Sequence, residues 1–201
     1  MDLITLLLFF ERTINMRMNC AVMIEKVGGE MKFFNSVQKN MSFGDVVASI
    51  KYFIKTNPDC KYKLAVGTDS QTKGRFTCFA TGIYIHREGS GAWGCISKRI
   101  QNRRYMSLRE KIAKETQLTY ELANMLNEEL MSALYDYVAR YENFDCRLEA
   151  HIAVGTKGET RRLIREMVGY FEGMGIDTKI KPEAFVASSY ANRYSKDVRV
   201  S

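Results

Sequence analysis

The chain has 201 residues, 46% of them hydrophobic and 26% charged, with 14 glycines and only two prolines. This composition is typical of one globular domain and argues against a disordered or low-complexity chain. The formal net charge is +7, from 30 basic and 23 acidic residues. Such an excess of positive charge favours a polyanionic partner such as nucleic acid, but it is equally consistent with a basic surface that contacts only solvent. The positions of the charged residues are needed to distinguish these two interpretations.

Five cysteines lie far apart in the chain and form no CxxC pair. This spacing argues against both a disulfide framework and a zinc site. We therefore expect free buried thiols in a reducing cytosol, and a cytoplasmic location.

The N-terminal 30 residues differ from the rest of the chain. Residues 4–10 (ITLLLFF) are apolar, but a transmembrane helix needs about 20 such residues, so no stable membrane insertion is expected. The flanking charges do not fit a signal peptide. We expect residues 1–30 to be a non-essential extension or the result of a start assigned too early, with the domain spanning residues 31–201. Weak membrane contact by residues 3–10 is the alternative.

Helix and strand signals alternate along the domain. Ser42 followed by Asp45 marks a helix start that resembles a capping box, and Asn57-Pro58 ends that helix. Apolar and aromatic runs then predict three strands, at residues 62–68, 76–86 and 93–100. The remaining elements are a long helix opened by Ser107, a strand over 148–154, a helix over 159–174, a strand over 178–180, and a last helix between Pro182 and Tyr194.

This order predicts the connectivity of the sheet. Three consecutive strands joined by short turns favour an antiparallel meander, and the two later strands, each preceded by a helix, should add in parallel through right-handed crossovers. The prediction is an α/β fold with a mixed five-stranded sheet flanked by helices, which is the ribonuclease H-like succession.

Several segments between residues 31 and 196 resemble the YkuK family, a bacterial group described as ribonuclease H-like. They are KNMSFGDVVASI, VGTDSQ, SLREKIAKETQLTYELA, TRRLIREMVGYFEGMG and IKPEAFVASSYANRYSK. The resemblance implies the ribonuclease H-like fold and a relationship to nucleases, without fixing a particular reaction.

Ribonuclease H-type hydrolysis uses two divalent metals, Mg²⁺ or Mn²⁺, held by carboxylates from several elements. Asp69 is the first candidate, because the TDS triplet at the end of the first long strand matches the superfamily's leading Asp motif. Ala65 and Gly67 on the same face are small and would leave room for a metal. The alternative is an ordinary turn Asp, since Asp-Ser is common in turns.

Two residues of the long helix, Glu115 and Glu121, compete for the second carboxylate. The segment from Thr116 to Glu121 superficially resembles the superfamily's helical motif. At about 100° per residue, however, Glu115 falls in the middle of the leucine stripe and Glu121 on the far side. A carboxylate on a packed face is costly unless it is paired or binds metal, which favours Glu115.

The resemblance implies a third and a fourth metal ligand, but this chain has no acidic residue at the matching positions. Ala153 stands on the fourth predicted strand where YkuK relatives tend to have Asp, and Glu149 or His151 on the same face are substitutes. Histidine is a poor ligand for Mg²⁺, and a lone strand histidine is more often structural. Asn192 on the last helix can give a carbonyl oxygen, although ordering the neighbouring strand ends is its more common role. We therefore predict Asp69 and Glu115 as catalytic metal ligands, with His151 and Asn192 as further metal-ligand candidates.

Basic residues gather in two places. Residues 98–114 hold seven basic side chains and one acid, and a second group opens the helix after the fourth predicted strand. Both groups should lie at the sheet edge that carries Asp69, where the three parallel strands end. The residues expected to contact nucleic acid, RNA or DNA, are Arg103, Arg104, Lys157, Arg161 and Arg165.

The sequence therefore predicts a metal-dependent nuclease or phosphodiesterase of the ribonuclease H-like superfamily. The alternative is a non-catalytic nucleic-acid-binding domain with a degenerate metal site, so enzymatic activity itself stays open.

Overall fold

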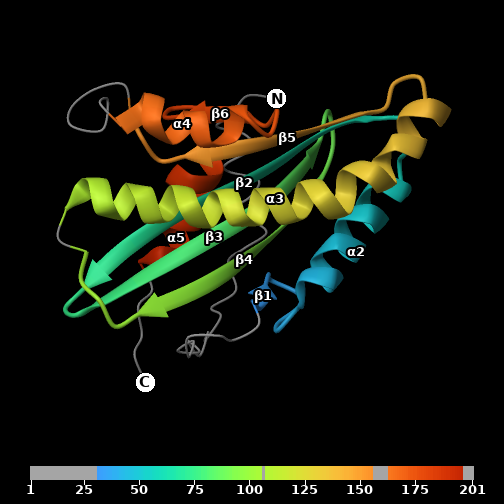
Figure 1. Cartoon of the computed structure of the whole chain (residues 1–201). Coiled ribbons are helices and arrows are strands. Elements are labelled where there is room, and N and C mark those ends of the chain that lie inside the picture. The colour runs from blue at the N-terminus through green and yellow to red at the C-terminus, as the bar shows by residue number, and fades with distance from the viewer. Residues whose placement is uncertain (1–30, 106, 156–162, 197–201) are drawn as a thin grey trace.

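The computed structural model describes residues 31–105, 107–155 and 163–196 and shows a twisted mixed sheet with helices on both faces (Figure 1). The strand order is β1-β4-β3-β2-β5-β6. The strands are β1 (Phe33–Phe34), β2 (Lys61–Lys73), β3 (Phe76–Arg87), β4 (Ala92–Gln101), β5 (Asp145–Ile152) and β6 (Asp177–Ile180). The helices are α2 (Phe43–Lys55), α3 (Leu108–Arg140), α4 (Ile164–Glu172), the π-helix η2 (Val186–Ala191) and α5 (Asn192–Ser195).

The predicted fold class is confirmed, with one addition to the sheet. β2, β3 and β4 form the antiparallel meander, and β5 and β6 extend it in parallel. The additional strand, β1, pairs antiparallel with β4, with Phe33 opposite Ser97. A two-residue strand is too short to show the alternation that identifies strands in a sequence, so the predicted five strands become six.

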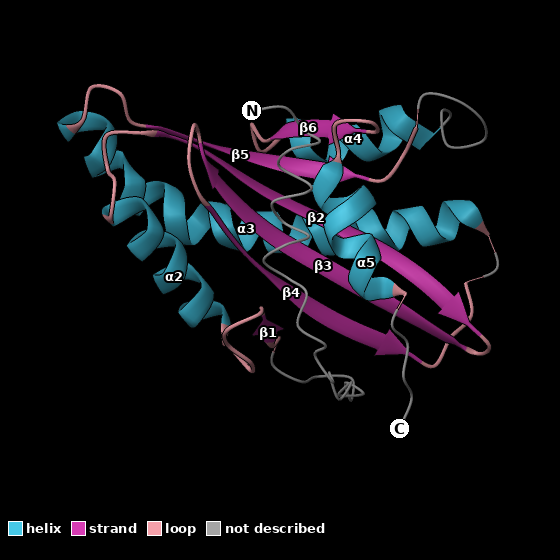
Figure 2. Cartoon of the chain, turned by 180° about the vertical axis from the view of Figure 1, so that it is seen from behind, coloured by secondary structure: helices cyan, strands magenta, loops and turns pink. Residues whose placement is uncertain are grey.

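The helices divide between the two faces of the sheet, as the opposite views of Figures 1 and 2 show. α2, α3 and α4 share the main hydrophobic core with one face, represented by Leu64, Ile83 and Ala150. η2 and α5 pack on the other face, against Ala65, Ala80 and Ile96. Because neighbouring residues of a strand point to opposite faces, each residue of β2 is committed to one helical layer or the other.

The capping box predicted at Ser42 is present. Asp45 N–H donates to Ser42 Oγ at 3.2 Å, and Ser42 N–H donates to Asp45 Oδ2 at 2.8 Å. These bonds satisfy two backbone groups that the first turn of α2 leaves without helical partners.

Replacing Ser42 with Ala should lower the free energy of unfolding by about 1 kcal/mol, because the variant loses the cap of α2. Chemical denaturation of both chains measures this difference. Ser49→Ala is the matched control, because the Ser49 hydroxyl bonds only the Asp45 carbonyl one turn before it. A loss for Ser42→Ala no larger than the loss for Ser49→Ala would contradict the expectation.

The predicted last helix is divided into η2 and α5, and its backbone lies close to β2. A Cβ atom on Gly67 would lie 2.7 Å from the Ala187 backbone nitrogen and 2.9 Å from the His151 carbonyl oxygen. The small residue at position 67 therefore admits the η2 backbone. The sequence-based expectation that Gly67 leaves room for a metal is wrong, because protein atoms already fill that space.

Two further expectations concern the chain as a whole. The four cysteines within the described residues are free thiols; Cys78 and Cys95 are buried as predicted, whereas Cys60 and Cys146 are only partly buried. No helix among the described residues is both long and apolar enough to cross a membrane. The extension over residues 1–30 and the start of the helix predicted from residue 159 lie outside the described residues.

Candidate functional site

Asp69 lies where β2 extends beyond its neighbour β5. The pairing of these two strands ends with Thr68 opposite Ile152, and Asp69 is the next residue of β2. From this point β2 has β3 on one side and, among the residues that the structure describes, no strand on the other. Groups from the two faces of the sheet can therefore meet around this edge.

The Asp69 side chain belongs to the face covered by η2 and α5. Its Oδ2 atom accepts a hydrogen bond of 2.5 Å from Ser195 Oγ, which comes from α5. Burial raises the pKa of Asp69, while the Ser195 hydrogen bond and the charges of Lys111, Lys181 and Lys196 oppose that shift. Asp69 is thus a partly buried carboxylate held in place by the last helix.

Glu115 projects from α3 toward the opposite face of the same strand. Only 5% of the residue is exposed, as the leucine stripe predicted, and its Oε1 accepts a hydrogen bond of 2.7 Å from Ser70 Oγ. Burial raises the pKa of Glu115 to about 7; the Ser70 hydrogen bond and Lys111 lower it, and the negative charge of Asp69 raises it further. The charge of Asp69 therefore acts on Glu115 from the opposite face of β2.

A chain of threonines fixes α3 on the sheet beside Glu115. Thr119 Oγ1 donates to Thr68 Oγ1 at 3.0 Å, and Thr68 Oγ1 lies 3.0 Å from Thr81 Oγ1. All three residues are buried. Because buried hydroxyls are costly without partners, this network fixes the position of α3, and with it the height of Glu115 above β2.

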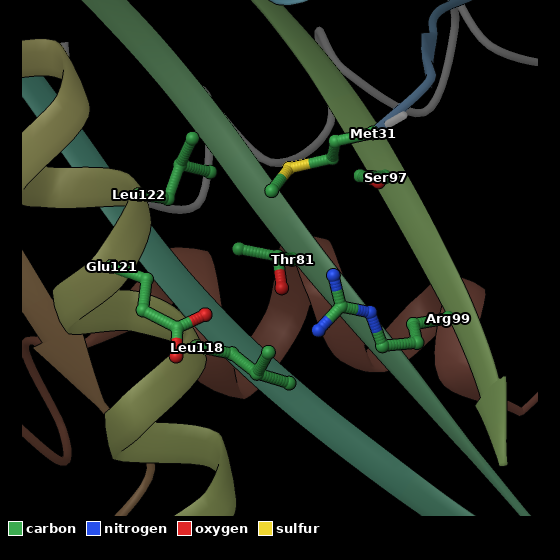
Figure 3. A pocket seen from close by; sticks show the side chains of 7 residues that line it. All are labelled: Met31, Thr81, Ser97, Arg99, Leu118, Glu121 and Leu122. Atoms are coloured by element: carbon green, nitrogen blue, oxygen red, sulfur yellow. The ribbon is translucent and has the colours of Figure 1, made fainter. Parts of the chain in front are cut away.

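Glu121 occupies a different place from Glu115. It is half-buried and lines a pocket with Thr81, Ser97 and Arg99 from the sheet, as Figure 3 shows. Its Oε1 accepts a hydrogen bond of 2.8 Å from Gln117. The expectation that Glu121 lies on the solvent side is therefore wrong, because α3 crosses the twisted sheet and carries this residue over β3 and β4.

His151 is buried on the same sheet face as Asp69 and has partners at both ring nitrogens. Val186 N–H donates to His151 Nδ1 at 3.2 Å, and His151 Nε2 lies 3.2 Å from Glu149 Oε2. An acceptor at Nδ1 places the ring proton on Nε2, so the ring donates to Glu149. This hydrogen bond is the main reason that the pKa of Glu149 is lowered. The arrangement ties η2 to β5, and a metal on His151 would have to break one of these two bonds.

Asn192 and Ala153 add no charged group to the carboxylate pair. The Asn192 side-chain amide donates to the Ser188 carbonyl at 3.1 Å within its own helix. Ala153 follows the end of β5. On the last helix the residue that contacts Asp69 is Ser195, which the sequence did not reveal.

The predicted nucleic-acid contacts have different surroundings. Arg103 forms an ion pair with Glu110 and lies over the Tyr105 ring at 4.8 Å. Arg104 and Arg165 are exposed. Lys157 and Arg161 lie outside the described residues. In addition, Lys111, Lys181 and Lys196 surround Asp69 closely enough to lower its pKa.

The donor set determines which metal chemistry the site suits. Carboxylate and hydroxyl oxygens are the ligands that Mg²⁺ and Mn²⁺ prefer, and Asp69 and Glu115 supply two such carboxylates at one edge. No group of three or more His, Cys, Asp or Glu side chains arranged for a metal occurs within the described residues. Within the described residues, Asp69 and Glu115 therefore have no third His, Cys, Asp or Glu side chain grouped with them.

The comparisons with known proteins agree with this fold. Residues 45–196 match the family described as Ribonuclease H-like, and the chain belongs to that family. It is similar to the protein YkuK of Bacillus subtilis (strain 168), with 40% identity over 166 residues, covering 82% of this chain and 96% of the relative. No solved structure matches significantly. The chain is thereby related to the nuclease superfamily, in which divalent metals are common.

Proposed function

We propose that this protein is a divalent-metal-dependent nuclease or phosphodiesterase acting on nucleic acid. The observation that carries the proposal is the Asp69–Glu115 pair, in which Asp69 comes from β2 and Glu115 reaches the same strand from α3 on the other face of the sheet. Glu115 is almost completely buried, and a buried carboxylate is costly unless it is paired or binds a metal. Because an acid at this position lowers the stability of the fold, a role in metal binding explains it better than a structural role.

The surrounding residues would orient the reaction. Asp69 and Glu115 would hold a single Mg²⁺ or Mn²⁺, with Ser195 and Ser70 fixing one oxygen of each carboxylate. A divalent ion, when bound, supplies activation of water and stabilisation of the charge that develops on a phosphate. Exposed Arg104 and Arg165 would attract the phosphate backbone, as would Lys157 and Arg161.

Asp69→Asn is the direct test of the metal-dependent reaction. The substitution keeps the size of the side chain and removes its negative charge, so cleavage of RNA, DNA or a hybrid in Mn²⁺ or Mg²⁺ should be abolished. Glu121→Gln, purified in the same way, is the control and should keep the wild-type rate. If the wild-type chain cuts none of the three substrates with either metal, the proposal is wrong.

A second candidate, nucleic-acid binding without catalysis, is favoured by Ala153 and by the missing third acid. In that case affinity would fall steeply with salt, since phosphate contacts release counterions. Binding would also persist in a chelator and survive Asp69→Asn. Fluorescence anisotropy with labelled RNA and DNA, run beside the cleavage assay, separates the two functions.

A further inference from the structure

The hairpin between β2 and β3 continues past Asp69 to a tip at residues 73–76, the hairpin tip. The two strands pair as far as Lys73 opposite Phe76. Gly74, at a φ of +61°, and Arg75 form the turn between them. Lys73 and Asp69 point to the same face of β2, because they are four residues apart, and roughly 13 Å separates them along the strand. The hairpin tip therefore extends the side of the sheet that carries Asp69.

The connection from β4 to α3 lies beside the hairpin tip (Figures 1 and 2). Thr77 Oγ1 donates to the Arg103 carbonyl oxygen at 2.8 Å and lies 3.0 Å from Thr72 Oγ1, so the connection is tied to both strands of the hairpin. Tyr105 packs edge-to-face on Phe79, with ring centroids 5.3 Å apart. These contacts fix the β4–α3 connection against the hairpin.

Each of these two segments holds an arginine over an aromatic ring. The Arg75 guanidinium lies 5.0 Å from the centroid of the Phe76 ring, and Arg103 lies 4.8 Å from that of Tyr105. Both arginines are exposed. A guanidinium that packs on a ring keeps its flat group in a preferred orientation, and unpaired bases stack on such planes. Bases within a duplex stack on one another and are not available for this contact.

The sequence around both segments is basic. Residues 71–79 and 98–109 contain no Asp or Glu, and Lys73 and Arg104 add exposed positive charges to the two arginines. The nearest acids along the chain are Asp69 and Glu110, and Glu110 forms an ion pair with Arg103. A surface with this excess of positive charge attracts a phosphate backbone.

We propose that the hairpin tip and the β4–α3 connection bind an unpaired stretch of nucleic acid. Unpaired bases stack on Arg75 and Arg103. Exposed Lys73 and Arg104 hold the neighbouring phosphates. The proposal rests on the nucleic-acid partner of the proposed function, and it adds the single-stranded form of that partner and a binding surface beyond Asp69. This surface acts by stacking and charge alone, so binding to it requires no metal ion.

Arg87 provides a matched comparison at the other end of β3. Its guanidinium also lies over a phenylalanine ring, that of Phe53, at 5.5 Å. Arg75→Gln and Arg87→Gln therefore remove the same charge from the same kind of pair, but only Arg75 belongs to the hairpin tip. Arg75→Lys keeps the charge and loses the flat guanidinium, which separates stacking from charge.

The experiment is fluorescence anisotropy of the full chain in a chelator, with labelled single-stranded RNA and DNA and with duplexes of the same sequences. The wild-type chain should bind the single strands more tightly than the duplexes. Arg75→Gln should weaken single-strand binding about fivefold, and Arg75→Lys should recover little of this affinity, because both variants lose one stacked base. Only Arg75→Gln should also reduce the slope of log affinity against log salt, by about 0.7. Arg87→Gln should stay within about twofold of the wild type.

Each outcome supports or overturns the proposal. Equal affinities for Arg75→Gln and Arg87→Gln, or tighter binding of the duplexes, would overturn it while leaving the proposed nuclease intact. Arg75→Lys binding as tightly as the wild type would also overturn it, because charge alone would then explain the contact. A wild-type chain that binds no nucleic acid would overturn both. Arg103→Gln should weaken single-strand binding in the same way as Arg75→Gln, and circular dichroism checks that every variant is folded.

Discussion

Glu115→Gln should stabilise the protein by about 3 kcal/mol at pH 8, although it removes a proposed metal ligand. Burial raises the pKa of Glu115 to about 7, whereas an unfolded chain has a glutamate pKa of about 4.3. Gln resembles the protonated carboxyl group, and its side-chain oxygen can still accept the Ser70 hydrogen bond. The variant therefore avoids the cost of ionising a buried acid.

The pH dependence follows from the direction of this shift. Between about pH 4 and pH 7 the folded chain keeps a proton that the unfolded chain has lost, so the contribution of Glu115 to stability falls as pH rises through this window. Above pH 7 both states are ionised and the loss is complete. The two chains should be close in stability near pH 4 and differ most at pH 8.

Urea denaturation at pH 5 and pH 8 measures the effect. Glu121→Gln is the control, because Glu121 is only partly buried, its Gln117 hydrogen bond can be kept by an amide oxygen, and the change should alter stability by less than about 0.5 kcal/mol. Adding Mn²⁺ at pH 8 should stabilise the wild-type chain and not Glu115→Gln, because a ligand stabilises only the state that binds it. A Glu115→Gln variant less stable than the wild type at pH 8 would contradict the prediction.

Gly67→Ala should lower the free energy of unfolding by about 1–3 kcal/mol, because a methyl group would overpack the contact between β2 and η2. The new Cβ would lie 2.7 Å from the Ala187 backbone nitrogen. The Ala187 nitrogen and the His151 carbonyl oxygen, which lies 2.9 Å away, are both backbone atoms, so neither can move aside by changing rotamer. The expected adjustment is a shift of η2 away from the sheet, which would also strain the Ser195–Asp69 hydrogen bond.

Thermal and urea unfolding measure this loss. Gly169→Ala is the control, and its expected effect has the opposite sign. Gly169 lies in α4, where a Cβ meets nothing within 4 Å, so this change should raise the free energy of unfolding by about 0.5–1 kcal/mol. A Gly67→Ala variant as stable as the wild type would show that η2 adapts at no cost.

Much of the candidate site can be predicted from local patterns. The TDS triplet of the first long strand points to Asp69, although the strand continues to Lys73, and the leucine stripe of α3 places Glu115 on the packed face. The burial of Glu115 follows from helical geometry alone, because side chains about one turn apart share a face. The short β1 and the division of the last helix into η2 and α5 could not be predicted, because neither leaves a periodic signal.

The partners of the carboxylates depend on residues far apart in the chain. Ser195 is 126 residues from Asp69, and Ser70 is 45 residues from Glu115. A serine carries no local mark of such a contact. The surroundings of His151 are equally non-local, since its Nδ1 bonds a backbone group of η2 35 residues away.

Asp69, Glu115 and the meander followed by parallel strands can thus be obtained from the sequence, because alternation and helical periodicity are local properties of the chain. Only the tertiary structure shows that β5 ends at Ile152, opposite Thr68, so that within the described residues Asp69 has no strand partner on this side of β2. It also places Lys111 Nζ 3.9 Å from Glu115 Oε1 and fills the space next to Gly67 with η2. These features depend on the register between strands and on how closely the helices pack, which are set by contacts between distant segments.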